Sequence, residues 1–439
     1  MPQSQSHWDK IRPQFDALPY PDEPLDKTPS QDAYFLTQHN YAIPYYLRNR
    51  QVVDTTGKWI LDAGCGSGFS LLALAIANPG ANLVGVDLSP KSLEVAQQRL
   101  EYHQIPNPFY LHCLPLEALS TLPYRFDYIN CDDVLYLLED PAVGLAAMRS
   151  VLNADGIIRA NMHSVLQRVD YYRVQKFWAK LGCLEGSPSP EEMAVTRQTM
   201  AALKDWVMAK RQTWRPVFET DDQGLLMNHL FRGDTGVTMA DFSTFLQRAE
   251  LEFINMLEWR QWNLADLFKN IEDLPIAVAL GIAEMTLEEQ LHLFELLHPI
   301  HRLLDVYCGH PGQGRDRPPI EDWPDSLWQQ TTVYLHPQLN TAAFKAGLEE
   351  GAKTLGLFSF DPYLKINEQP ITVDSSFASC LHALLSKPQT VPDLVKRWQQ
   401  VRPVHLITLA PTTPESAFQT VRTFLVGLEG AGYIMLETP

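Results

Sequence analysis

Short apolar runs alternate with stretches of helical spacing over residues 58–164. Runs typical of buried strands occur at residues 59–64, 82–86, 109–112, 126–130 and 156–160. Helices are expected between them, at residues 70–78, 90–103 and 142–152. Because strands that alternate with helices form a parallel sheet covered on both faces, we predict an α/β fold for this part of the chain.

The middle of the chain has a different pattern. Residues 165–222 and 264–308 have helical composition, and a strand is expected between them at 251–257. In the second helical stretch, an apolar stripe from Leu293 to Leu304 is expected to lie in the core. A late seventh strand of the sheet is expected at residues 331–339.

The last hundred residues predict a helix, a turn, a second helix, a longer helix and a strand, which is a winged-helix-like order. We therefore expect three parts. They are an N-terminal arm or lid at 1–55, a domain at 56–340 with helical insertions at about 165–222 and 264–310, and a winged-helix-like domain at 341–439.

Charge and cysteine content narrow the classes of function. The 439 residues include 35 Lys and Arg against 52 Asp and Glu, a formal charge of −17, which disfavours a general nucleic-acid binder. None of the six cysteines has metal-site spacing, so we expect neither a zinc site nor disulfides, and a cytoplasmic location. No apolar run is long enough for a membrane span.

The strongest local motif is Leu-Asp-Ala-Gly-Cys-Gly-Ser-Gly at residues 61–68, between an expected strand and an expected helix. Glycines at alternate positions let the backbone bend and approach a ligand. Asp87 closes the next expected strand, where a carboxylate can accept both hydroxyls of a ribose. A dinucleotide site has GxGxxG, whereas this chain has GxGxG preceded by Asp62, which suits a cationic ligand.

Four segments of residues 58–164 resemble class I S-adenosylmethionine-dependent methyltransferases: ILDAGCGSG, VGVDLSPKSLEVAQQRL, FDYINCDDVLYLLEDP and GIIRANMHS. The resemblance implies a Rossmann-like sheet and S-adenosylmethionine as the cofactor. It also implies that Asp62 and the backbone of Gly64 face the methionine part, that Asp87 binds the ribose, and that Leu88 lies beside the adenine.

This chain departs from the family pattern at one point. An acid often follows the third strand, near the adenine amino group, but Pro115 stands there in this chain. Apolar packing and backbone groups of Leu114 or Leu116 are expected to bind the adenine instead. The cofactor-binding candidates are Asp62, Gly64, Cys65, Gly66, Gly68, Asp87, Leu88, Leu114, Leu116 and Cys131.

The acceptor side is expected at Asn130-Cys131-Asp132-Asp133, where the fourth strand ends. Asp132 either holds an acceptor N–H or contacts the cofactor's amino group, and Asn130 can help to hold an amide. His163 either serves as a general base or is a structural residue. Asp132, Asn130 and His163 are the catalytic candidates. No metal is expected, because the sulfonium is already an activated electrophile.

The length and plan of the chain resemble protein methyltransferases that hold a protein between a catalytic domain and accessory domains. Segments such as YAIPYYLRN and EWRQWNLADLFK also resemble a cyanobacterial group that includes a phycobiliprotein asparagine methyltransferase. Our first hypothesis is therefore methylation of a protein side-chain nitrogen, with asparagine of a phycobiliprotein β subunit as the specific case. The alternatives are a methyltransferase for a quinone or pigment precursor and a cofactor-binding regulator without turnover.

Overall fold

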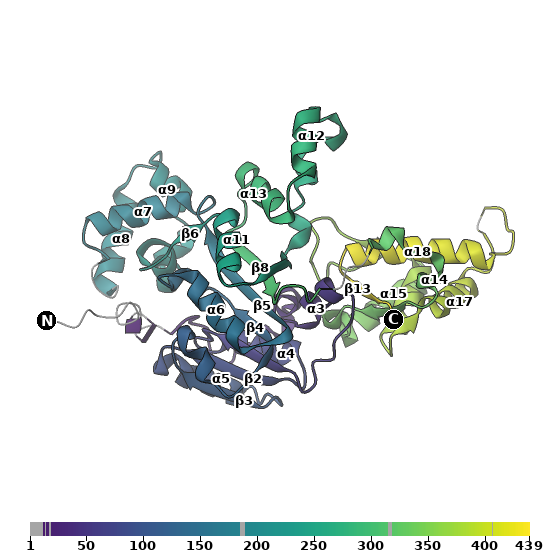
Figure 1. Cartoon of the computed structure of the whole chain (residues 1–439), viewed down its shortest axis with the longest axis horizontal. Helices are drawn as coiled ribbons and strands as arrows, with labels where there is room; N and C mark the ends of the chain where they lie inside the picture. The colour runs from purple at the N-terminus through teal and green to yellow at the C-terminus, as the bar shows by residue number, and fades with distance from the viewer. Residues whose placement is uncertain (1–11, 14, 17–18, 185–188, 315–317, 406) are drawn as a thin grey trace. The chain divides into compact units, whose positions relative to one another are not determined.

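The computed structural model describes residues 12–13, 15–16, 19–184, 189–314, 318–405 and 407–439, and divides the chain into two compact units. The first unit comprises residues 1–27, 58–72 and 82–312. The second comprises residues 28–57, 73–81 and 313–439. Both are drawn in Figure 1.

One sheet organises the first unit, with the strand order β3-β2-β1-β4-β5-β8-β7 and β6 beside β5. Its strands are β1 Trp59–Ala63, β2 Asn82–Asp87, β3 Phe109–Cys113, β4 Phe126–Cys131, β5 Leu152–Ser164, β6 Gly236–Val237, β7 Glu252–Met256 and β8 Leu303–Gly309. Strands β1 to β5 pair in parallel, and β8 pairs antiparallel with both β5 and β7. The predicted α/β, Rossmann-like fold is therefore confirmed.

Apolar residues on both faces of this sheet explain the continuous apolar runs in the sequence. Every residue of β4 is buried, and the core continues into the helices that follow the strands. Of these helices, α6 Pro141–Val151 and α11 Met239–Arg248 contribute to this core, and α4 Phe69–Ala77 and α5 Pro90–Tyr102 follow β1 and β2. Because parallel strands end at the same edge, the turns after β1, β2 and β4 lie together there.

Helices occupy the region of the first expected insertion. Residues 165–222 contain α7 Val169–Lys180, α8 Pro190–Ala202 and α9 Met208–Thr213, and α10 Asp222–Leu225 follows. Val174 and Trp178 of α7 pack with Met200 of α8 in a small separate core. These helices lie beside the carboxyl end of β5.

The prediction of helix through residue 308 is wrong at its end. Helices α12 Ile276–Ala283 and α13 Leu287–Leu297 form, but Leu303–Gly309 is strand β8, buried between β5 and β7. Short apolar runs with helical spacing do not distinguish a buried helix from a buried strand. The predicted stripe is also wrong in part, because Leu296, Leu297 and Ile300 are exposed.

The second unit has its own sheet, in the antiparallel order β12-β9-β13. Its strands and helices are α2 Ala33–Gln38, α3 Ala42–Asn49, α14 Asp325–Trp328, β9 Thr332–Leu335, α15 Ala342–Thr354, β10 Phe358–Ser359, β11 Thr372–Val373, α16 Ser375–Leu384, β12 Gln389–Thr390, α17 Val391–Val401, α18 Pro414–Gly430 and β13 Ile434–Glu437. The predicted order of three helices and a strand is present in α16, α17, α18 and β13. The winged-helix resemblance itself stays a prediction.

The expected boundaries at 55 and 340 differ from those of the two units. The run at 331–339 is predicted to extend the main sheet, but β9 pairs with β12 and β13 instead, and the C-terminal part of the second unit begins at Gln313. Residues 28–57 also belong to the second unit, while residues 19–27 belong to the first. Part of the expected arm, at 1–11, 14 and 17–18, lies outside the described residues.

None of the described helices combines the length and the apolar character needed to cross a bilayer.

Candidate functional site

The glycine turn after β1 leaves no room for side chains. Gly64, Gly66 and Gly68 have φ angles of 89°, 50° and 83°, in the left-handed region. A Cβ atom on Gly64 would lie 2.3 Å from Val134 Cγ2, and one on Gly66 would lie 2.1 Å from the carbonyl oxygen of Tyr20. Because these residues carry no side chains, the backbone of the turn is accessible from a neighbouring cavity.

That cavity, called here the first cavity, follows the carboxyl ends of β1, β2, β3 and β4. Its lining comes from the turns after those strands and from the N-terminal segment. The lining residues are Phe15, Tyr20, Gly64, Gly66, Val86, Asp87, Leu88, Ser92, Leu114, Pro115, Leu116, Asp132, Asp133, Val134 and Leu137.

The structure brings seven of the predicted site residues to this cavity: Gly64, Gly66, Asp87, Leu88, Leu114, Leu116 and Asp132. Asp87 Oδ2 accepts a hydrogen bond from Gly66 N at 2.9 Å, and Oδ1 accepts one from Ser89 N at 2.8 Å. These backbone N–H groups fix the carboxylate at the cavity. Burial raises the pKa of Asp87.

Four other candidates lie behind the cavity rather than in its lining. A Cβ on Gly68 would lie 2.7 Å from Ala96 of α5, so this glycine is required for packing of the helix. Cys65 and Cys131 are both buried in the core. Asp62 is buried as well, and its carboxylate accepts hydrogen bonds from Ser70 Oγ at 2.6 Å and from Asn130 Nδ2 at 2.9 Å.

Burial raises the pKa of Asp62 to about 6, although the hydrogen bonds from Ser70 and Asn130 oppose the shift. Asn130 is fully buried in β4 and also accepts a hydrogen bond from Arg159 Nη1 at 3.1 Å. Both ends of its amide are thus engaged inside the protein. Asn130 therefore positions Asp62 and Arg159, and the prediction that it holds the methyl acceptor is wrong.

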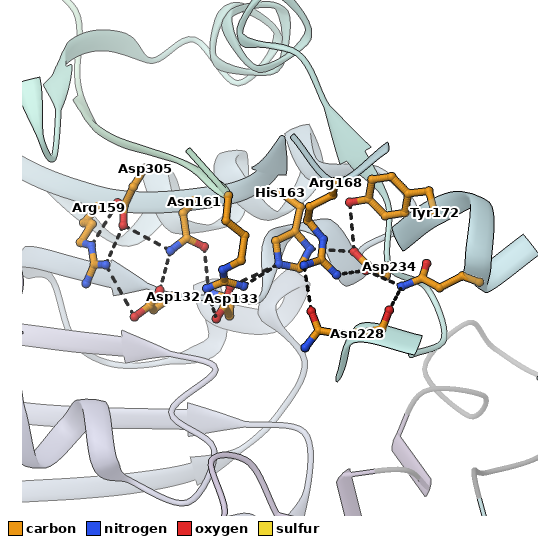
Figure 2. A network of polar contacts seen from close by, with 12 residues as sticks. Asp132, Asp133, Arg159, Asn161, His163, Arg168, Tyr172, Asn228, Asp234 and Asp305 are labelled. Carbon is orange, nitrogen blue, oxygen red and sulfur yellow. Dashed lines mark hydrogen bonds and ion pairs between the residues drawn. The ribbon is translucent and has the colours of Figure 1, made fainter. Parts of the chain in front are cut away.

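Asn161 of β5 fixes the loop after β4. Its Nδ2 donates to Asp132 Oδ1 at 2.5 Å, and its Oδ1 accepts from Asp133 N at 2.8 Å. Asp133 has φ 56°, a left-handed conformation that is rare outside glycine. Arg159 Nη2 lies 3.6 Å from Asp132 Oδ2 and 2.7 Å from Asp305 Oδ2 of β8. Figure 2 shows these side chains as one continuous network.

His163, two residues farther along β5, belongs to the same network (Figure 2). Its Nδ1 lies 2.7 Å from Asp234 Oδ1, and Arg302 Nη1 lies 2.9 Å from its Nε2. Since an arginine can only donate, Nε2 of His163 is the acceptor. The ring proton is therefore on Nδ1, which donates a hydrogen bond to Asp234. Burial lowers the pKa of His163, and the Tyr136 ring stacks on it at 4.2 Å.

Asp234 is a buried anchor for this histidine. Arg168 Nη2 at 2.8 Å, Gln175 Nε2 at 2.9 Å and Tyr172 Oη at 3.2 Å donate to it in addition to His163. Burial alone would raise the pKa of Asp234, but these hydrogen bonds and charges hold it well below its usual value. The carboxylate therefore stays ionised and fixes the tautomer of His163.

A second cavity adjoins the first, and Tyr20 lines both. Its walls come from β5, α7, the segment around α10 and the start of β8. The lining residues are Tyr20, His163, Gln167, Arg168, Tyr171, Arg215, Asp221, Gln223, Gly224, Met227, Asn228 and Arg302.

The N-terminal segment lies on the glycine turn. Ser67 N donates to the Tyr20 carbonyl at 2.8 Å, and Ser67 Oγ donates to the Pro21 carbonyl at 2.6 Å. Arg99 of α5 donates to the Glu23 and Pro24 carbonyls at 2.7 and 2.8 Å. Hydrogen bonds to their backbone thus hold residues 20–24 against the glycine turn and α5, and Tyr20 of this segment lines the first cavity.

Sequence reasoning missed Asn161, Asp234, Arg302 and Asp305. Arg159, Asn161 and His163 alternate along a buried strand, and polar residues in such a pattern were a usable signal. Asp234 and Arg302 lie far from β5 in the chain, and no local pattern marks them. Asp305 was hidden because its strand was assigned to a helix.

Known proteins resemble both the sequence and the fold. The family described as "Methyltransferase domain" matches residues 54–220. An uncharacterized protein of Synechococcus sp. is 26% identical over 314 residues, which cover 71% of this chain and 73% of that protein. Ubiquinone biosynthesis O-methyltransferase of Coxiella burnetii is 40% identical over 91 residues, which cover 21% of this chain and 37% of that enzyme.

Among solved structures, PKMT2 from Rickettsia typhi superposes with a TM-score of 0.59 at 16% identity, covering 92% of this chain and 75% of that one. The same protein in complex with AdoHcy gives a TM-score of 0.57 at 18% identity, covering 90% and 76%. At these identities the likeness shows the fold. The glycine turn, the Asp87 carboxylate and the acidic first cavity also fit a ligand that carries a ribose and positive charge. Residues 54–220 therefore match the family of methyltransferase domains and have the fold of class I methyltransferases, for which S-adenosylmethionine is the cofactor.

Proposed function

We propose that this protein methylates a side-chain nitrogen of another protein, and that asparagine of a phycobiliprotein β subunit is the acceptor. The observation that carries the proposal is the polar second cavity, which shares Tyr20 with the first and whose Arg302 lies 3.5 Å from Asp133 of the first. The fold of PKMT2, which resembles this chain over 92% of its residues, supports a protein substrate. The Synechococcus relative supports the cyanobacterial setting.

The residues of the first cavity have separate tasks in this proposal. Asp87 holds the ribose, and Leu114 and Leu116 pack on the adenine. S-adenosylmethionine supplies a methyl group on a sulfonium, which needs no further activation. Asp132 accepts a hydrogen bond from the acceptor N–H and orients the nitrogen, since positioning of two reactants is a large part of such catalysis.

His163 is the proton acceptor in this proposal. An asparagine amide nitrogen is a weak nucleophile because its lone pair is delocalised, so removal of its proton assists attack. His163 is neutral with a lone pair on Nε2, and Asp234 stabilises the imidazolium that forms. In this proposal the acceptor N–H replaces Arg302, which donates to Nε2 of His163 in the structure, and the proton passes from the acceptor nitrogen to that Nε2.

A small-molecule acceptor, such as a quinone or pigment precursor, is the alternative. The ubiquinone biosynthesis O-methyltransferases favour it, although their match covers 21% of this chain for the Coxiella enzyme and 24% for a Neisseria meningitidis one. A closed apolar pocket beside Asp132 would also favour it. The second cavity instead contains three arginines and a histidine, which favours a polar acceptor.

The test is transfer of radioactive methyl from labelled S-adenosylmethionine to a cyanobacterial extract and to purified, unmethylated phycobiliprotein. We expect label in the β subunit and N-methylasparagine after digestion. Label that appears only in a small-molecule fraction would support the alternative acceptor instead. Cofactor binding with no labelled product in any fraction would indicate a regulator without turnover.

A further inference from the structure

The two adjoining cavities present opposite charge. The lining of the first includes the carboxylates of Asp87, Asp132 and Asp133, and among the described residues it includes no Lys, Arg or His. This charge suits a sulfonium and an ammonium group. The lining of the second cavity includes three arginines and one carboxylate, in a chain whose formal charge is −17.

The acids that pair with these arginines do not line the second cavity. Asp234, the partner of Arg168, is fully buried behind the wall, and its side chain has no exposed surface. Asp133, which lies 3.5 Å from Arg302, lines the first cavity. Asp221, the one acid in the lining, accepts a hydrogen bond from Gly224 N at 2.7 Å. The lining of the second cavity therefore carries more hydrogen-bond donors and positive charge than acidic groups.

Arg215 has unused binding capacity. It is exposed in the segment after α9, and no hydrogen bond or ion pair joins its side chain to any described residue. Gln223 adds a second unused donor, since its Nε2 is buried without a hydrogen-bond partner among the described residues. Guanidinium groups bind carboxylates and phosphates through paired N–H donors.

We infer that the second cavity binds an oxyanion of the methyl acceptor, a carboxylate or a phosphate group, through Arg215 and Arg302. The inference deepens the proposed function and rests on it, because it assigns the second cavity to the acceptor. It predicts an acceptor whose methylated nitrogen lies close to an acidic group. A lysine ammonium is disfavoured as the acceptor, because the guanidinium of Arg215, which has no acidic partner among the described residues, would repel it.

The inference is tested by direct binding, without methyl transfer. Saturation-transfer NMR with the full-length protein compares N-acetylaspartate with N-acetylasparagine, which differs from it in charge at nearly the same size. Inorganic phosphate, added as a competitor, separates the two sources of the oxyanion. If phosphate displaces N-acetylaspartate, the site accepts either group, and if it does not, the site is specific for a carboxylate.

Arg215→Gln and Arg211→Gln form a matched pair for this experiment, because both arginines are exposed and only Arg215 lines the cavity. We expect N-acetylaspartate to bind more tightly than N-acetylasparagine, and Arg215→Gln to weaken it roughly three- to five-fold while Arg211→Gln does not. Equal binding of both probes, equal effects of both variants, or no binding at millimolar probe would overturn the inference.

The outcome is separable from that of the proposed function. Labelling of phycobiliprotein tests the acceptor, whereas the probe titration tests the chemistry of the cavity. Charge-selective binding that depends on Arg215, combined with unlabelled phycobiliprotein, would reject the phycobiliprotein and keep the oxyanion site.

Discussion

At the scale of single residues, the site separates groups that face the cavities from groups that hold them in place. Asp132 and His163 each line a cavity, while Asn161, Asp234 and Asn130 lie behind them and make the hydrogen bonds that orient them or their neighbours. Substitution of each of these side chains is therefore expected to change a different measured quantity.

Asp132→Ala tests the acceptor-holding role. If Asp132 orients the acceptor nitrogen, the single-turnover rate should fall about ten-fold or more, since about 1.4 kcal/mol of lost positioning is already ten-fold. Cofactor affinity, measured by titration calorimetry, should change much less. A variant with weak cofactor affinity and a parental rate at saturation would instead assign Asp132 to the cofactor.

His163→Gln tests the proton-accepting role through pH. Because burial lowers the pKa of His163 below its usual 6.5, the imidazole stays neutral through neutral pH. Activity should therefore be lost as pH falls through that lowered pKa. The variant should be about a hundred-fold slower. Its rate should also lack this acidic limb in a pH profile of single-turnover transfer, whereas a purely structural histidine would leave the limb unchanged.

Asp62→Asn tests the cost of a buried carboxylate. The folded-state pKa of about 6 lies above the ordinary value of 3.8, so the folded state binds the proton more tightly and stability falls as pH rises between the two values. At neutral pH the variant should be more stable, on the order of 2 kcal/mol, and should bind the cofactor less tightly. Urea unfolding near pH 4 should show no such gain. An equal gain at both pH values would contradict the assignment.

At the scale of elements, the N-terminal segment packs directly on the glycine turn. The Tyr20 carbonyl accepts from Ser67 N, and it also occupies the space that a side chain on Gly66 would need. A glycine is therefore needed in this turn for two reasons: a side chain would collide with the N-terminal segment, and it would also obstruct the cofactor.

Gly66→Ala should displace residues 20–24 and weaken cofactor binding ten-fold or more, because the new Cβ would meet the Tyr20 carbonyl at 2.1 Å. Gly57→Ala is the control, since Gly57 also has positive φ and a Cβ there would meet no atom within 4 Å. Limited proteolysis of residues 20–24 should accelerate only in Gly66→Ala. Similar proteolysis of the two variants would show backbone strain to be the cause.

At the scale of the whole molecule, the two units have separate tasks. Every residue that lines the two cavities belongs to the first unit. In the second unit, Tyr46 of α3 joins the C-terminal elements, since its hydroxyl donates to Glu429 at 2.8 Å and accepts from Leu436 N at 3.1 Å. Arg50 forms an ion pair with the same glutamate.

Tyr46→Phe should therefore destabilise the second unit by about 1–3 kcal/mol, because buried groups lose their hydrogen-bond partner. Cofactor affinity should be unchanged. Tyr45→Phe is the control, as no hydrogen bond of the Tyr45 hydroxyl is found among the described residues. Calorimetric unfolding and cofactor titration test the two expectations, and loss of cofactor affinity in Tyr46→Phe would contradict this division of tasks.

The sequence by itself determined the elements whose signals are local. The strands and helices of residues 58–164 follow from apolar periodicity and turn residues, and the glycine motif with Asp87 indicated the cofactor. Seven predicted residues line the first cavity, because parallel strands bring their carboxyl ends to one edge wherever the intervening helices lie.

Only the tertiary structure decided the contacts that join distant parts of the chain. Asp234 and Arg302 reach His163 from separate elements, and β8 enters the sheet between β5 and β7 from more than a hundred residues beyond β5. Periodicity over a short apolar run is the same for a buried helix and a buried strand, and backbone pairing with a partner strand resolves that ambiguity. For the same reason β9 was assigned to the wrong sheet, since its pairing with β13 is a property of the folded chain and not of its own residues.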